Sequence, residues 1–116
     1  MIKTSLLITA IIISLSSCYY DVESELYQNQ VCNTPATIDY ATDVAPVIAA
    51  ACGTPSCHAT GGTGTGNFET YEGVKAKVDD GSFEDRTFVQ KNMPPTPLNT
   101  CDLELLQAWV AAGAQP

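Results

Sequence analysis

CGTPSCH, residues 52–58, is the most informative segment of the chain, because it gathers two thiols and the only histidine into seven positions. Two cysteines followed at once by a histidine are typical of c-type haem attachment, in which the thiols bind the porphyrin and the imidazole reaches the iron. The usual spacing has two residues between the thiols, whereas four separate Cys52 from Cys57. The segment therefore predicts covalent haem attachment through Cys52 and Cys57, with His58 on one face of the iron.

The other face of the iron has one candidate ligand. Apart from Met1, the chain has a single methionine, Met93, in the segment KNMPP (residues 91–95). A lone methionine is commonly a buried gap-filler, but prolines restrict the backbone beside this one and there is no second histidine. Methionine and histidine together are the axial pair of electron-transfer haem proteins. We therefore expect Met93 opposite His58.

The N-terminal residues have the composition of an export signal. Lys3 precedes an apolar run over residues 6–15, which is too short to span a bilayer because a spanning helix needs about 20 apolar residues. The run ends in LSSC (residues 15–18), which resembles the lipobox of bacterial lipoproteins. We expect residues 1–17 to be a lipoprotein signal peptide and Cys18 to carry lipid. An ordinary signal peptide or an uncleaved anchor is the alternative.

The remainder is expected to hold a flexible tether and one acidic domain. Residues 18–37 are polar and show no sustained period, which leaves residues 38–116 for the domain. Five Lys and Arg against thirteen Asp and Glu give the chain a formal charge of −8. This charge disfavours nucleic acid as a partner and favours a protein with a basic docking patch. Solubility alone explains the charge equally well.

Cys32 and Cys101 remain once lipid and haem have been assigned to the other three cysteines. Thiols of an exported protein lie in an oxidising compartment and tend to pair. A Cys32–Cys101 disulfide is therefore expected to tie the start of the domain to its last helix, although sequence alone does not determine connectivity.

Apolar side chains at spacings of three and four predict helices over residues 42–52, 70–80 and 99–112. The expected N-terminal caps are Thr42 or Ala41 for the first, Thr70 for the second and Asn99 for the third. Residues 82–86 are expected to add a short helical turn. The glycine-rich residues 59–67 are expected to form a surface loop, because they lack the Lys-Ser/Thr of a phosphate-binding loop.

Three side-chain positions follow from these helices. Lys75 and Lys77 are expected to face water, opposite an apolar stripe on the second helix. Residues 87–89 are expected to lead outward to the Met93 loop. Trp109 is expected to pack against the first helix.

These segments resemble class I cytochrome c domains, most of all the small lipoprotein cytochromes of Bacteroidetes-type bacteria, some of which have four residues between the haem cysteines. The resemblance covers about residues 38–116. It is carried by YATDVAP (40–46), CGTPSCH (52–58), YEGVK (71–75), MPP (93–95) and the segment from Asp102 to Ala114. It implies a small all-α bundle, in which the N- and C-terminal helices cross and enclose one haem c bound by Cys52, Cys57, His58 and Met93.

The resemblance also implies a function. The expected protein is a membrane-anchored carrier of single electrons in the cell envelope, facing the periplasm or the cell surface; it is not an enzyme, and its partners are redox proteins. One alternative is a haemless lipoprotein in which Cys52 and Cys57 form a disulfide, acting as a structural or binding module. Another is a haem sensor or peroxidase from whose iron Met93 dissociates. A zinc site would need Cys52, Cys57, His58 and Cys101, and an oxidising compartment disfavours its thiolates.

Overall fold

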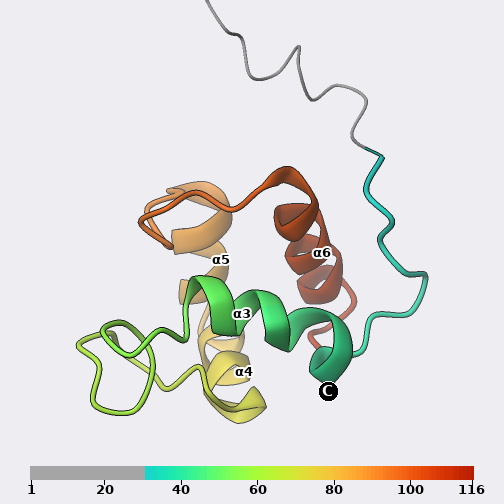
Figure 1. Cartoon of the computed structure of the whole chain (residues 1–116). Helices are drawn as coiled ribbons and strands as arrows, with labels where there is room; N and C mark the ends of the chain where they lie inside the picture. Colours follow the sequence, from blue (N-terminus) through green and yellow to red (C-terminus); the bar gives the residue numbers. More distant parts are fainter. Residues whose placement is uncertain (1–30) are drawn as a thin grey trace, which may run out of the picture. The chain divides into compact units, whose positions relative to one another are not determined.

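The computed structural model describes residues 31–116, and all the regular secondary structure in that part is helical, with no strand (Figure 1). The all-α class is therefore confirmed for these residues. The expected signal peptide, the lipidation site Cys18 and the first part of the tether lie outside the described residues. The elements in chain order are η1 (Tyr40–Val44), α3 (Ala45–Ala51), α4 (Tyr71–Asp79), α5 (Ser82–Glu84), η2 (Asp85–Val89) and α6 (Thr100–Ala111).

The first helical segment begins earlier than expected. The Asp39 carboxylate accepts a hydrogen bond from the Thr42 backbone N–H at 2.9 Å, and the Asp43 carboxylate accepts one from the Asp39 N–H at 2.8 Å. This reciprocal capping satisfies two backbone donors, so η1 starts at Tyr40 and runs directly into α3. The expected cap at Thr42 or Ala41 was wrong, because the Asp39 side chain reaches the same donors from outside the helix.

The α4 helix has the expected ends. The Thr70 hydroxyl accepts a hydrogen bond from the Gly73 N–H at 3.2 Å, which confirms the predicted cap. Gly81 has φ +79°, the left-handed conformation that closes a helix at low cost for glycine. The following helical turn, however, does not stop at Arg86. It continues through η2 to Val89, so the expectation that residues 87–89 lead outward was wrong.

The last helix, α6, is the one that local sequence specifies best. The Asn99 side chain accepts a hydrogen bond from the Asp102 N–H at 2.9 Å, and Gly113 has φ +93° just after the helix. Both predicted ends are thus confirmed. None of the helices within residues 31–116 combines the length and the apolarity needed to cross a membrane.

Aromatic rings join the N-terminal helical segment to α4 and α6. The Tyr40 ring of η1 lies 5.0 Å from the Tyr71 ring and 5.5 Å from the Trp109 ring, measured between centroids. The Tyr71 hydroxyl and the Trp109 N–H donate hydrogen bonds at 2.8 Å to the C-terminal carbonyls of Ala114 and Gln115. The predicted contact of Trp109 with the first helical segment is confirmed. The two hydrogen bonds give the Tyr71 hydroxyl and the Trp109 N–H each a partner.

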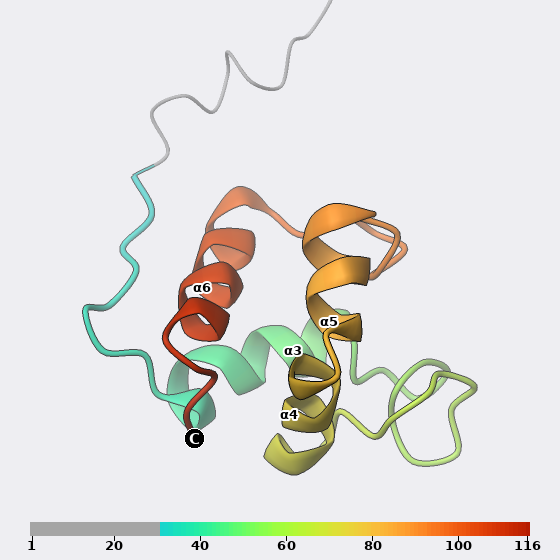
Figure 2. The same cartoon turned by 180° about the vertical axis from the view of Figure 1, so that it is seen from behind.

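Four aliphatic side chains of η1, α3, α4 and α6 complete this core. Val44, Ile48, Val74 and Leu106 are fully buried in one cluster with Tyr40 and Trp109. Figures 1 and 2 show α6 lying across the start of the η1–α3 segment, with α5 beside it and the loop between α3 and α4 projecting from the other end. The two ends of the η1–α3 segment therefore serve different purposes: its start packs in the core, and its last residues lie beside the projecting loop.

The predicted disulfide is present. Cys32 is bonded to Cys101 of α6, with the two Cα atoms 5.2 Å apart. Residues 31–37 contain no helix or strand, so this bond attaches an otherwise irregular segment to the helical core. Cys52 and Cys57 are free thiols.

Candidate functional site

One cavity of about 300 Å³ collects all four side chains that the sequence singled out as haem ligands. Cys52 lies at the end of α3, Cys57 and His58 follow it, and Met93 comes from the loop between η2 and α6. The walls between them are largely apolar, with Phe68, Phe83 and Pro94 among the lining residues. Segments about 35 residues apart in the chain, at residues 58 and 93, thus converge on one space.

The four-residue spacer between the cysteines folds back on itself. The Cys57 N–H donates to the Thr54 carbonyl at 2.9 Å, and the His58 N–H donates to the Cys52 carbonyl at 3.2 Å. The second bond closes the spacer, because it joins the first cysteine directly to the histidine that follows the second. The two extra residues are therefore absorbed in a turn, and both thiols and the imidazole still reach the same cavity.

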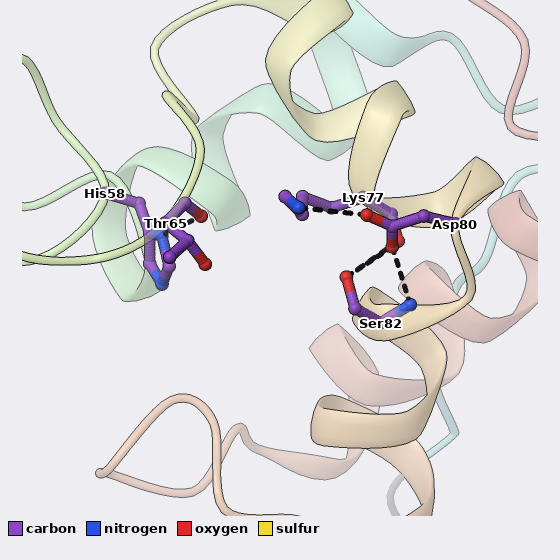
Figure 3. A network of polar contacts seen from close by, with 5 residues as sticks. All are labelled: His58, Thr65, Lys77, Asp80 and Ser82. Atoms are coloured by element: carbon purple, nitrogen blue, oxygen red, sulfur yellow. Dashed lines mark hydrogen bonds and ion pairs between the residues drawn. The ribbon is translucent and has the colours of Figure 1, made fainter.

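The imidazole of His58 is oriented by two contacts. Its Nδ1 lies 3.1 Å from the Thr65 carbonyl oxygen (Figure 3). Its ring stacks on Phe68 with centroids 4.3 Å apart and planes at 12°. A carbonyl can only accept, so Nδ1 carries the proton and donates. This leaves the lone pair on Nε2, the tautomer in which a histidine can bind a metal.

Gly64 allows the loop to approach this imidazole. A Cβ at this position would lie 2.6 Å from both Cε1 and Nδ1 of His58 and 2.9 Å from the Cys57 carbonyl oxygen. Real Cβ atoms essentially never come closer than 3.0 Å to another heavy atom. Glycine is therefore required here by space, and the glycine-rich surface loop of residues 59–67 forms one wall of the cavity.

We expect Gly64→Ala to lower the free energy of unfolding by about 1–3 kcal/mol, the range typical of overpacking. The new methyl group must displace either the His58 ring or the Cys57 carbonyl. Urea denaturation measures the change. The control is Gly53→Ala, where the nearest atom to the new Cβ would be Ala49 Cα at an ordinary 3.4 Å. Equal losses in the two variants would contradict the spatial role of Gly64.

Met93 is held at the edge of the cavity by its backbone. The N–H groups of Asn92 and Met93 both donate to the Arg86 carbonyl, at 3.1 and 3.3 Å. Its side chain is 42% exposed, so it sits at the mouth of the cavity and not in the core. Met93 therefore does not act as the buried gap-filler that a lone methionine commonly is, and it lines the same cavity as Cys52, Cys57 and His58.

The protonation of Cys52 disfavours a thiolate metal site. Burial, and in second place the charge of Cys57, raise the pKa of the Cys52 thiol to about 11. Cys101, the fourth zinc ligand considered, is bonded to Cys32. Among residues 31–116 no three side chains of histidine, cysteine or acid lie close enough to hold a metal ion together. The zinc arrangement considered from the sequence is thus not assembled.

The cavity of this acidic chain is lined by two cations and by no carboxylate. Lys77 and Arg86 both reach it. Lys77 is half-buried and does not simply face water as expected, because the end of α4 turns that side toward the cavity. Within residues 31–116, Arg86 makes no ion pair. Arg86 is exposed, so water can accept its hydrogen bonds, and two cations beside apolar walls suit a ligand that is both apolar and anionic.

Lys77 belongs to a small network on the wall facing His58 (Figure 3). Its ammonium donates to Asp80 at 2.9 Å, and the Ser82 N–H donates to the same carboxylate at 2.8 Å. Hydrogen bonds from the Ser82 hydroxyl and Lys77 lower the pKa of Asp80 to about 2. Asp80 therefore stays charged at neutral pH and holds Lys77 beside the cavity.

The sequence reasoning missed the lining residues Lys77, Ser82, Arg86 and Thr87. A usable signal existed for two of them. Lys77 lies three residues after the buried Val74, and Thr87 lies four residues after the buried Phe83, so each shares a helical face with a core residue.

Comparison of the chain with protein-family models, with curated proteins and with solved structures gave no match.

Proposed function

We propose that this cavity binds one haem c and that the protein carries single electrons in the cell envelope. In this proposal Cys52 and Cys57 hold the porphyrin through thioether bonds, and His58 and Met93 are the axial ligands. The observation that carries the proposal is the convergence of two thiols, an imidazole with its Nε2 available and a thioether on one largely apolar cavity.

The cavity walls support a ligand of this chemistry. Haem is a flat apolar ring that carries two carboxylates. The aromatic and proline side chains that line the cavity suit the ring, and Lys77 and Arg86 suit the carboxylates. The absence of any acidic side chain among the lining residues fits the same ligand, since thirteen Asp and Glu are available in the chain.

Contacts within the chain hold both proposed ligands, His58 and Met93, in position. Thr65 holds the His58 proton on Nδ1, and Phe68 holds the plane of the ring. The backbone hydrogen bonds to the Arg86 carbonyl hold the Met93 segment beside the cavity. When bound, haem supplies a one-electron couple, whose potential methionine ligation raises relative to two histidines. If His58 and Met93 both bound the iron, no position would be left for a substrate, and such a group would transfer electrons without catalysing a reaction.

The place of action is proposed from the N-terminal sequence. Lipid on Cys18 would anchor the domain to a bacterial membrane, since several acyl chains on one residue anchor stably whereas a single one binds marginally. The acidic charge of the chain suits redox partner proteins with basic docking patches.

The direct test is an absorption spectrum of the protein purified from cells able to attach haem, oxidised and reduced, followed by acid–acetone extraction. We expect haem that resists extraction and, in the oxidised protein, the weak far-red band of sulfur ligation. Extractable haem would contradict thioether attachment. Resistant haem without the far-red band would remove Met93 from the iron, and no haem at all would overturn the proposal.

A further inference from the structure

Three side chains form a hydrogen-bonded clasp at the base of the glycine-rich loop, residues 59–67. The Thr60 N–H and hydroxyl both donate to one oxygen of the Glu69 carboxylate, at 2.9 and 2.5 Å. The Asn67 side chain donates to the Thr60 hydroxyl at 3.3 Å and accepts from the Glu69 N–H at 2.8 Å. Thr60, Asn67 and Glu69, which we call the loop clasp, therefore join the two ends of the loop.

The loop clasp closes the segment that orients the His58 imidazole. The Thr65 carbonyl, which lies 3.1 Å from Nδ1, belongs to the loop (Figure 3). Phe68, which stacks on the imidazole, lies between Asn67 and Glu69. Its N–H donates to the His58 carbonyl at 2.7 Å. Movement of the clasp would therefore move both groups that fix the ring.

The half of the loop that contains Thr65 has no other support by hydrogen bonds. The first half is fixed by the Gly64 N–H, which donates to the Cys57 carbonyl at 2.9 Å. Within residues 31–116, Thr65 makes no hydrogen bond except the one to His58, and Gly66 makes none. Gly66 has φ +90°, and glycine has more backbone freedom than any other residue. The position of the Thr65 carbonyl therefore depends on the clasp that follows it.

The loop clasp is itself fixed to the start of α4. A Cβ at Gly73 would lie 1.6 Å from the Asn67 carbonyl oxygen, so the first turn of the helix lies directly against the clasp. The Glu69 side chain is exposed, yet hydrogen bonds from the Thr60 hydroxyl and then from the Thr60 N–H lower the pKa of its carboxyl. Glu69 is therefore ionised at neutral pH and accepts from both donors.

We propose that Glu69 is a positioning residue for His58: through the loop clasp, its carboxylate keeps the Thr65 carbonyl on Nδ1 of the imidazole. The stacked Phe68 ring is held by the same contacts. The inference rests on the proposed function, because the position of the ring decides how Nε2 meets a metal. A hydrogen bond donated by Nδ1–H makes the imidazole a stronger ligand through Nε2. A stronger ligand stabilises the oxidised state of the bound group, so the clasp is expected to lower its potential.

Two pairs of variants of the full haem-loaded protein test this role. Glu69→Ala removes the carboxylate, and Glu72→Ala is the matched control for the lost charge. The Glu72 side chain is also exposed, lies three residues later and makes no hydrogen bond or ion pair within residues 31–116. The second pair changes no charge: Thr60→Val removes the hydroxyl of the clasp, whereas Thr60→Ser keeps it.

In the reduced protein, we expect Glu69→Ala to speed hydrogen exchange of the His58 Nδ1 proton by about five- to tenfold, the equivalent of one net hydrogen bond, and to raise the midpoint potential. Thr60→Val should change both in the same direction but by less, because the Thr60 N–H still donates to Glu69. Glu72→Ala and Thr60→Ser should leave the exchange rate at the wild-type value. A general loss of stability would not follow this pattern.

Unchanged exchange in Glu69→Ala, or equal changes within either pair, would overturn the proposal. Haem that resists extraction from the wild type keeps the proposed function intact whatever the Glu69 variants show. A haemless wild type overturns the proposed function, and nitrogen NMR of the same full chain in mildly alkaline solution then decides the role of Glu69. The His58 proton should stay on Nδ1 in the wild type and be shared between both nitrogens in Glu69→Ala; the same tautomer in both would overturn the positioning role.

Discussion

Replacing Cys52 and Cys57 together by alanine is expected to abolish covalent haem attachment. Both thiols line the cavity, and the His58–Cys52 backbone hydrogen bond keeps them within one turn. With neither thiol present, no bond holds the porphyrin once the fold is disrupted. Haem staining after denaturing electrophoresis and intact mass measure the result: the wild type should gain the mass of one haem, and the double variant none.

Single substitutions show whether each thiol forms its own bond to the haem. Cys52→Ala and Cys57→Ala should each keep one thioether bond, and the two should be distinguishable from the double variant by residual staining. The matched control is the pair Cys32→Ala and Cys101→Ala, which removes two cysteines that lie outside the cavity. Staining that survives in the Cys52/Cys57 double variant would show that attachment uses other residues.

The second large effect is expected on stability. Removing the Cys32–Cys101 disulfide by alanine at both positions should lower the free energy of unfolding by about 4 kcal/mol, because a bond between residues 69 apart in sequence restricts a long loop of the unfolded chain. Residues 31–37 have no helix or strand of their own. Urea denaturation of the oxidised protein measures the loss.

Two comparisons isolate the contribution of the bond. Val31→Ala changes a neighbouring side chain that is 91% exposed and should leave stability within about 0.5 kcal/mol. A reductant should destabilise the wild type by nearly the same amount as the double substitution and should leave the double variant unchanged. A loss below about 1 kcal/mol in the double variant would mean that the loop-closure term is offset in the unfolded state.

Local chemistry explains why some helix ends were predictable and one was not. Thr70 and Asn99 each precede a helix, and both act as predicted. Around the first helix, Asp39, Thr42 and Asp43 are all able to cap, and the choice depends on which donors remain free. The Asp39 carboxylate takes the Thr42 N–H, so the helix begins at Tyr40.

Lys77 and Thr87 show the limit of the same reasoning at the site. A lysine between apolar helical positions normally keeps its head in water, and a threonine after a short helical turn normally lies in a loop. Their actual surroundings depend on how α4, α5 and η2 pack beside the segment after Cys52, which periodicity within one helix does not describe. Both residues line the cavity for that reason.

The sequence by itself determined the features that depend on neighbours in the chain: the all-α class, the caps at Thr70 and Asn99, and the candidate ligands Cys52, Cys57, His58 and Met93. Only the tertiary structure decided which of these meet. It brought Met93 to the His58 cavity, placed two cations and no acid along it, and joined Cys32 to Cys101. The physical reason is that contacts between segments far apart in sequence depend on how whole helices pack, whereas caps and motifs depend on hydrogen bonds and spacings within a few residues.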